Sequence, residues 1–195
     1  SGKNGVATSI GHAPIPALIS PRAGSRIAIG KALSNIIWAP LEKNLESVTL
    51  SANWMWPCNT PGEDARLYEA VESCSNFAIE LGINIPTGKD SLSMKQKYKD
   101  KEVVSPGTVI ISAAANCNNI SNIIEPVFQT NDQDIYYINL ANNNFNIGGS
   151  ALSQTLGFIG SSTIDTCDPS YFKKTFNVFQ NLIKENLISS GHDVS

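Results

Sequence analysis

Lys31 and Asn35 are the first residues whose types and spacing could do chemistry. They lie four residues apart in a segment whose apolar residues recur with helical spacing, so both side chains project from one face of a helix. A polar pair on one helical face can ligate a nucleotide or a metal ion. The plainer interpretation, a pair exposed to solvent, applies to most such pairs, and the spacing alone does not decide between them.

A second candidate is the segment Gly88-Lys89-Asp90-Ser91, which follows a predicted strand. Glycine allows the backbone to approach a ligand closely, Lys89 offers a positive charge to a phosphate, and Asp90 is a ligand suited to a hard cation. The segment lacks the earlier glycine of a Walker A loop. A simple turn and a phosphate site remain equally open on spacing alone.

Two further stretches carry weaker signals. Residues 142–150 are rich in Asn and Gly and lead from a predicted strand into a short helix, so their N–H groups could cradle an anion. His192 and Asp193 follow a predicted helix stop, where Asp193 could be a metal carboxylate or part of a tail. Neither pattern is specific by itself.

The elements that must position these residues can be predicted from periodicity and capping. Ser20-Pro21 is a start signal for a helix that runs to about Trp38, and a second helix begins near Gly62 and stops at Gly82. Apolar and β-branched runs predict strands at 48–56, 83–86, 107–115 and 135–140. A last helix begins after Asp168-Pro169 and is expected to stop at Gly191, and the first twenty residues are expected to form a loop or irregular strand.

These elements predict a mixed α+β fold with two parts. Composition shifts around residues 128–134, which we take as the boundary between a first domain, 1–129, and a second, 130–195. Residues up to about 129 are expected to form a mixed sheet backed by the helices that start near Pro21 and Gly62. A separate small unit is expected to begin near Asp134.

The composition excludes several classes of protein. Fourteen basic against 17 acidic residues give a net charge of −3, which argues against a nucleic-acid-binding surface. No uninterrupted apolar stretch approaches the roughly 18 residues of a membrane span. The four cysteines are far apart and form no Cys-x-x-Cys pair, so we expect neither a zinc site nor a disulfide framework, and free thiols in a reducing cytoplasm.

Six segments in order carry a resemblance to a known family: GKALSNI, LSANWM, PGEDARLYEAV, IPTGKDSLSM, GGSAL and GHDVS. Together they resemble the large, single-chain form of the phosphoribosylformylglycinamidine synthase family, and the resemblance spans practically all 195 residues. PGEDARLYEAV and GKDSLSM are distinctive, whereas the glycine-rich segments are not. The fold it implies is that of aminoimidazole ribonucleotide synthetase: part of an N-terminal-type domain, then the start of a C-terminal-type domain.

The resemblance also implies roles for particular residues. In the family a Glu and an Asn of the GxALxN helix and the Asp of an HDxSDGG motif hold magnesium beside a nucleotide, which the Ser of that motif contacts. The matching positions are Asn35 and Asp193 for metal and Ser195 for nucleotide, while Lys31 stands where the family has Glu. That difference puts one magnesium ion in doubt and makes Lys31 a candidate phosphate ligand. The segment with Lys89, Asp90 and Ser91 faces a nucleotide or substrate phosphate in relatives, so Lys89 and Ser91 are nucleotide candidates and Asp90 a metal candidate.

The activity implied is a C–N ligase of purine biosynthesis. It converts formylglycinamide ribonucleotide to formylglycinamidine ribonucleotide with ATP, Mg²⁺ and ammonia from glutamine, which a glutaminase domain of the same chain would release. The glutaminase Cys, His and Glu have no counterpart here. We therefore expect a fragment of a larger enzyme, inactive by itself, with no nucleic-acid or membrane partner.

Two alternatives remain. Other members of the superfamily, such as selenophosphate synthetase or thiamine monophosphate kinase, are expected to lack LSANWM and PGEDARLYEAV, which this chain contains. The second alternative is a non-catalytic half that binds a structural nucleotide. Lys31 in place of Glu would fit such weakened metal chemistry.

Overall fold

The computed structural model describes residues 2–129, 133–141, 145–166 and 168–194. Its main sheet holds four strands in the order β1-β6-β2-β3, and a separate hairpin, β4-β5, extends from one end. The strands are β1 Gly5–His12, β2 Thr49–Met55, β3 Asn84–Ser91, β4 Lys95–Tyr98, β5 Lys101–Val104 and β6 Thr108–Cys117. The α-helices are α1 Pro14–Ile19, α2 Pro21–Ile36, α3 Glu63–Leu81, α4 Ala151–Thr155 and α5 Pro169–Lys184, with short 3₁₀ turns at Asn44–Ser47 and Ile120–Asn122.

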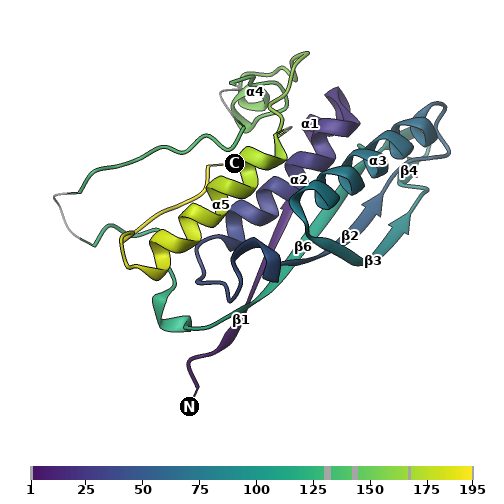
Figure 1. Cartoon of the computed structure of the whole chain (residues 1–195). Coiled ribbons are helices and arrows are strands. Elements are labelled where there is room, and N and C mark those ends of the chain that lie inside the picture. Colours follow the sequence, from purple (N-terminus) through teal and green to yellow (C-terminus); the bar gives the residue numbers. More distant parts are fainter. Residues whose placement is uncertain (1, 130–132, 142–144, 167, 195) are drawn as a thin grey trace.

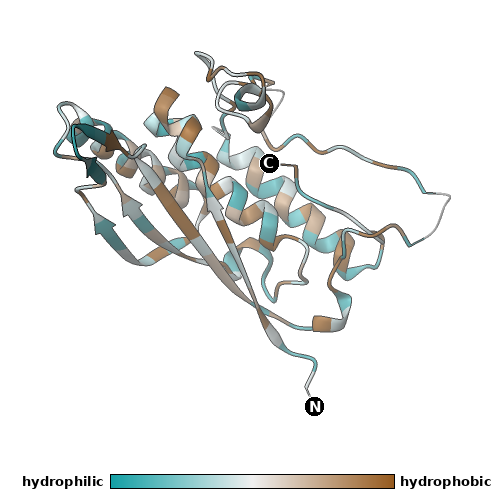
Figure 2. Cartoon of the chain, turned by 180° about the vertical axis from the view of Figure 1, so that it is seen from behind, coloured by the Kyte–Doolittle hydropathy of each residue, from teal (hydrophilic) through white to brown (hydrophobic). Residues whose placement is uncertain are grey.

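The sheet is mixed, and helices cover one of its faces. β6 pairs antiparallel with both β1 and β2, whereas β3 joins β2 in parallel. Side chains of β6 alternate between buried and solvent-facing positions along the whole strand, as expected where one face is packed and the other is open. Figure 1 shows α2, α3 and α5 in front of the sheet, and Figure 2, from behind, shows the strands with no helix over them.

The starts of α2, α3 and α5 and the stop of α3 were predicted well because each depends on a local signal. The Ser20 side chain accepts a hydrogen bond from Ala23 N at the start of α2, and Asp168 accepts one from Tyr171 N at the start of α5. Gly82 ends α3 in the left-handed conformation, at φ 75°. The mixed α+β class is therefore confirmed.

Four predictions of local structure were wrong. The first twenty residues, expected to be a loop or irregular strand, form the regular strand β1, because β6 supplies a pairing partner along its whole length, and the short helix α1. Gly88–Ser91, expected to be a loop, is the second half of β3. Residues 135–140 form no strand, and α5 ends at Lys184, well before Gly191.

The helix α5 packs into the same core as α2 and α3, although it lies beyond the predicted domain boundary. Its buried apolar side chains join the cluster formed by α2, α3 and the sheet; they are Phe172, Phe176, Phe179 and Ile183. Phe172 meets Phe77 of α3 edge to face, with ring centroids 6.0 Å apart. The predicted first domain, 1–129, therefore shares its core with α5 of the predicted second domain, 130–195. The division into two domains at residue 129 stays a prediction.

One polar side chain fixes α5 to the turn that follows α2. Gln180 is fully buried; its Oε1 accepts from Leu41 N at 2.9 Å, and its Nε2 donates to Ile37 O at 2.5 Å and Ala39 O at 3.1 Å. Every polar atom of this side chain thus has a backbone partner, as a buried amide requires.

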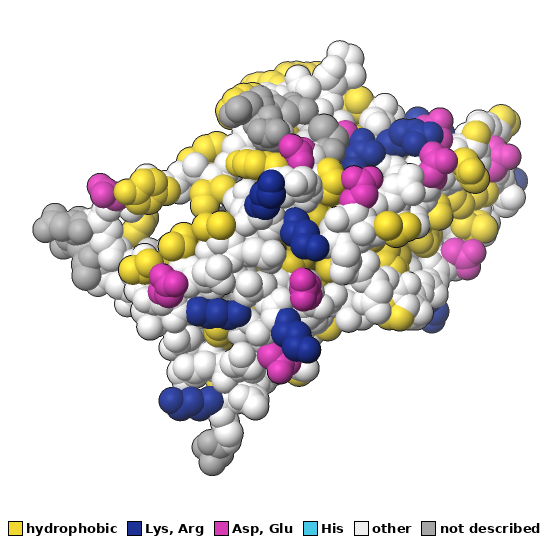
Figure 3. All heavy atoms as spheres, in the orientation of Figure 1, with side chains coloured by type: hydrophobic (Ala, Val, Ile, Leu, Met, Phe, Trp, Pro, Cys, Tyr) yellow, Lys and Arg dark blue, Asp and Glu magenta, His cyan; other side chains and the backbone are white. Residues whose placement is uncertain are grey.

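Part of the segment between β6 and α5 stands away from the core, although Ile124 and Leu140 pack against it. Large apolar side chains of its described part are strongly exposed, among them Ile135, Tyr136 and Tyr137. Figure 3 shows hydrophobic side chains along the segment that projects from the body at the left of the view. The short helix α4 follows, at the predicted place, with Ser150 as its cap.

Candidate functional site

Lys31 and Asn35 lie where α2 packs most closely against β1. A Cβ atom on Gly11 would stand 2.1 Å from Ala28 O and 2.4 Å from Ala32 N, so this glycine is what permits the contact. Ser9 Oγ donates to Ala32 O at 2.6 Å, and Asn35 Nδ2 donates to Ile10 O at 3.2 Å. The predicted shared face of the helix is therefore turned toward the edge strand β1.

Asp193 belongs to the last described segment, which passes Trp38 just beyond the C-terminal end of α2. Gly191 lies against the indole of Trp38, where a Cβ would stand 2.1 Å from a ring carbon, and its N–H donates to Glu125 O at 3.2 Å. The Asp193 side chain is only 11% exposed, and its Oδ1 lies 3.1 Å from Nδ1 of His192, which is 74% exposed.

Lys31 and Asp193 interact electrostatically although 161 residues stand between them in the chain. Burial of the half-buried Lys31 lowers the pKa of its ammonium, and the negative charge of Asp193 opposes that shift by raising it. Lys31 and Asn35 therefore lie one helical turn apart on α2, and Asp193 comes near enough to Lys31 to affect the pKa of its ammonium. Ser195, the predicted nucleotide ligand, lies outside the described residues.

Lys89, Asp90 and Ser91 lie elsewhere, on the opposite edge of the sheet. Because β3 is a strand here, successive side chains alternate: Lys89 and Ser91 belong to one face and Asp90 to the other. Register pairs Lys89 with Asn53, Asn53 with Ile110, and Ile110 with His12. Three strand spacings of roughly 4.8 Å put Lys89 about 14 Å from β1.

A shallow groove of about 820 Å³ crosses the open face of the sheet between these two edges. Asn35 contributes to its lining at one side and Thr87 at the other. Between them the lining carries the hydroxyl residues Thr8, Thr49, Ser51 and Ser112 among apolar neighbours such as Ile10 and Ala114, together with Ser9, whose Oγ donates to Ala32 O of α2. Sequence analysis missed these residues, although small hydroxyl residues at every second position of a strand are a detectable signal of a polar open face.

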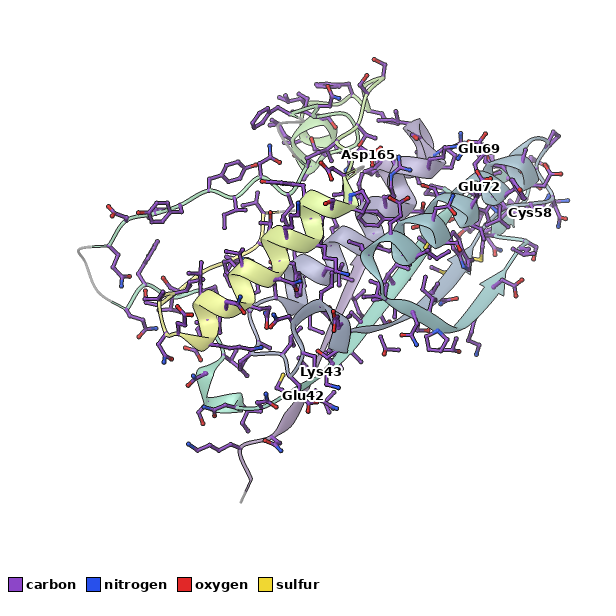
Figure 4. All side chains as sticks on the ribbon, in the orientation of Figure 1. Glu42, Lys43, Cys58, Glu69, Glu72 and Asp165 are labelled. Carbon is purple, nitrogen blue, oxygen red and sulfur yellow. The ribbon has the colours of Figure 1, made fainter. Side chains whose placement is uncertain are left out.

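The segment after α4 is attached to the helix layer by an ion pair that sequence analysis also missed. Arg26 of α2 donates from Nε to Asp165 Oδ1 at 2.8 Å and from Nη2 to Oδ2 at 2.5 Å, and it also contacts Ser73 Oγ of α3. In Figure 4, Asp165 lies where that segment passes the helices, with Glu69 and Glu72 on α3. Those two carboxylates pair with Arg22, one turn before Arg26.

The donor set at α2 is a weak fit to a magnesium ion. Among the described residues, no group of three or more His, Cys, Asp and Glu side chains gathers closely enough to hold a metal ion. The candidate oxygen ligands drawn from the sequence are the Asp193 carboxylate and the Asn35 amide oxygen, and Lys31, one turn before Asn35, adds a positive charge and not a third oxygen. Magnesium prefers a near-octahedral shell of oxygens.

The FGAR-AT PurM_N-like domain family matches residues 1–116. The chain belongs to this family. The confirmed α+β fold and the resemblance drawn from the sequence motifs agree with that membership.

Curated relatives are much longer than this chain. A probable phosphoribosylformylglycinamidine synthase, chloroplastic/mitochondrial, of Arabidopsis thaliana is 40% identical over 193 residues, and the phosphoribosylformylglycinamidine synthases of Dictyostelium discoideum and Homo sapiens are 38% and 35% identical. The alignments cover 98–100% of this chain and 14–15% of those proteins.

Solved structures show the same fold. The structure described as T. maritima PurL complexed with FGAR matches 98% of this chain and 29% of its own, with a TM-score of 0.68 at 13% identity. A complex of the same protein with ADP matches 98% of this chain and 27% of its own, with a TM-score of 0.64 at 13% identity. No helix within the described residues is long and apolar enough to cross a membrane.

Proposed function

We propose that this chain is part of a phosphoribosylformylglycinamidine synthase, a glutamine-using, ATP-dependent ligase that converts formylglycinamide ribonucleotide to formylglycinamidine ribonucleotide in purine biosynthesis. The observation that carries the proposal is 35–40% identity to proteins of that name over 98–100% of the chain. In this reaction ATP phosphorylates the formamide oxygen and ammonia displaces the phosphate. The protein contributes mainly positioning and electrostatic stabilisation.

The proposed cofactors of the whole protein are ATP or ADP and Mg²⁺. Related PurL structures are described as complexes with ATP, ADP, AMPPCP and FGAR, which supports nucleotide and substrate binding by this fold. Within this chain we assign Lys31 and Ser195 to a nucleotide, with Asn35 and Asp193 as the candidate oxygen ligands of a cation. Magnesium would supply charge neutralisation of the phosphates.

Lys89 and Ser91 form a second candidate contact with a nucleotide or substrate phosphate. Both residues belong to β3, at the edge of the sheet, and their side chains belong to the face of the sheet that carries the groove. Asp90 belongs to the other face, so a metal ion held by Asp90 would be separate from one held near Asp193. The proposed partners are the substrate, ATP and a glutaminase domain of the same chain, with no nucleic acid or membrane, and the proposed location is the cytoplasm.

We also propose that residues 130–195 begin a C-terminal-type domain. The exposed Ile135, Tyr136 and Tyr137 support this, because apolar side chains in such numbers normally contact further protein. Residues up to 129 remain the proposed N-terminal-type domain, with α5 packed on it.

The experiment is an assay of the full-length protein containing this chain, with formylglycinamide ribonucleotide, ATP, Mg²⁺ and glutamine. Formation of the amidine product with release of ADP and phosphate is expected, and glutamine should be replaceable by ammonia. The 195-residue chain alone, assayed with ATP and ammonia, should give background. Full-length protein that makes no amidine from either nitrogen source would refute the proposal.

A non-catalytic, nucleotide-holding role for this half is the second candidate, favoured by Lys31 at a position where the family has Glu. Lys31→Met in the full-length protein separates the two. A change in kcat at saturating ATP indicates a catalytic half. An unchanged kcat with weaker retention of a tightly bound nucleotide indicates a structural one.

A further inference from the structure

The segment that carries Lys89 and Ser91 has little of its own to hold it in place. In the sheet that the structure describes, β3 lies at an edge and has one neighbour, β2 (Figure 1). Every side chain of β3 from Pro86 to Ser91 is exposed, so none of them anchors the segment in the core. Backbone pairing with β2 ends at Met55 and Ser91. The segment therefore needs an anchor outside β3 if its side chains are to hold a phosphate in one position.

Trp56 supplies that anchor. Its backbone N–H donates to Ser91 O at 2.9 Å, directly after the last β2–β3 pair, and Cys58 N donates to Leu92 O at 2.9 Å. Trp56 is 1% exposed, and a Cβ on Gly107 would stand 2.2 Å from an indole ring carbon, so the ring lies against the backbone of that glycine. The end of β3 is thereby fixed to one of the largest buried side chains of the protein.

Glu63, the first residue of α3, holds the one polar atom of the Trp56 ring. Its Oε2 accepts from Trp56 Nε1 at 2.8 Å, and its Oε1 lies 3.3 Å from Nε of Arg66 in the same helix. Arg66 Nη2 in turn donates to Ala17 O at 2.6 Å and to Leu18 O at 3.1 Å, at the end of α1. Both carboxylate oxygens of Glu63 are therefore engaged, and its side chain is only 23% exposed, so the carboxylate is fixed from two sides.

We propose that Glu63 is a positioning residue for the phosphate contact of Lys89 and Ser91. By accepting the Trp56 indole N–H it keeps that ring, and through the ring the backbone of Ser91, where the two side chains can meet a phosphate. The inference rests on the proposed function for the phosphate contact and goes beyond it by giving a role to the motif PGEDARLYEAV, in which Glu63 lies. Releasing the anchor leaves the ammonium of Lys89 present but its backbone free to move, which lowers affinity for the phosphate.

The test is a double-mutant cycle in the full-length protein, measured by equilibrium binding of two probes, formylglycinamide ribonucleotide and ADP. Lys89→Met should weaken binding of the probe whose phosphate meets Lys89 about tenfold, the worth of one charged hydrogen bond. Glu63→Ala should weaken binding of the same probe about fivefold and leave that of the other unchanged. In the Lys89→Met background, Glu63→Ala should add less than about twofold, because the group that it positions is already absent.

Matched variants separate positioning from a merely structural role. Glu63→Gln keeps an oxygen that can accept from the indole, so it should restore most of the affinity that Glu63→Ala loses. Trp56→Phe keeps an aromatic ring but removes the N–H donor; it should repeat the effect of Glu63→Ala and replaces that variant in the cycle if Glu63→Ala fails to fold. Glu80→Ala removes an exposed carboxylate from the same helix and should change neither affinity.

Hydrogen exchange follows the anchor without any ligand. The Trp56 and Cys58 amides, which donate to Ser91 and Leu92, should exchange faster in Glu63→Ala than in the natural protein or in Glu63→Gln. Natural affinity or unchanged exchange in folded Glu63→Ala overturns the proposal, as does an equal loss of affinity with and without Lys89.

Amidine synthesis by the same preparations is assayed separately, so that the two proposals can fail independently. An active enzyme that lacks the coupling between Glu63 and Lys89 rejects this inference and leaves the proposed function standing. A protein that shows the coupling and makes no amidine rejects the proposed function alone. Failure of the natural protein to bind either probe overturns the inference together with the phosphate contact on which it rests.

Discussion

Replacing Gln180 by leucine tests whether one buried amide joins α5 to the rest of the core. Leucine keeps the approximate volume but removes the partners of Leu41 N, Ile37 O and Ala39 O, all three backbone atoms of the turn after α2. A buried hydrogen bond contributes about 1 kcal/mol net, and an orphaned buried group costs about 1–3 kcal/mol. The loss in unfolding free energy should therefore be about 3 kcal/mol or more.

The assay is urea unfolding of the chain followed by tryptophan fluorescence, since Trp38 packs edge to face on Phe179 at 5.0 Å and reports this contact. If the unfolding free energy falls by about 2 kcal/mol per molar urea, a loss of about 3 kcal/mol lowers the urea concentration at the unfolding midpoint by about 1.5 M. Hydrogen exchange of the Leu41 amide should accelerate in parallel. Gln154→Leu on α4, where the side chain is exposed, should change stability by less than about 0.5 kcal/mol. A folded Gln180→Leu variant as stable as this control would refute the reasoning.

Three further predictions follow from other contacts. Asp165→Asn removes the charged partner of Arg26, in an ion pair whose side chains are each about a fifth exposed. The variant should lower the unfolding free energy by about 1–3 kcal/mol and speed proteolysis within residues 145–166. Lys95→Ala, which removes an ion pair of the exposed β4-β5 hairpin, should do neither. Gly11→Ala should lower the unfolding free energy by about 1–3 kcal/mol, measured by thermal unfolding, because its methyl group would overlap Ala28 O. An unchanged melting temperature would contradict this by showing that α2 moves away from β1 without cost. Burial raises the pKa of Cys74 to about 12, so its contribution to stability is complete below about pH 9, where the unfolded thiol titrates, and is lost as pH rises toward 12. At pH 10.5 this loss is about 2 kcal/mol, and denaturation curves of Cys74→Ala should lack that slope.

The sequence predicts those parts of the fold whose cause is local. Ser20-Pro21, Gly82 and Asp168-Pro169 specify helix ends through their own backbone and side-chain preferences, and the structure confirms each. The strand β3 shows where this stops working. Glycine and charged residues favour a loop at 88–91, yet pairing with β2 holds the segment extended to Ser91, because the backbone hydrogen bonds of a neighbouring strand outweigh a weak local preference.

Interactions between distant residues were beyond the reach of local patterns, both at the candidate site and in the core. That Lys31 and Asn35 share a helical face follows from their spacing, but nothing in either segment indicates that Asp193 comes near enough to affect the pKa of Lys31. Gln180 shows the same limit in the core: its partners are backbone atoms of a turn that exists only once α2 and α5 have packed. A polar residue within an apolar stripe is therefore a signal of a distant partner, and the identity of that partner requires the folded chain. Arg26, on a helix whose other side chains are largely buried, is the corresponding signal on α2, and Asp165, 139 residues further along the chain, is the partner that the fold supplies.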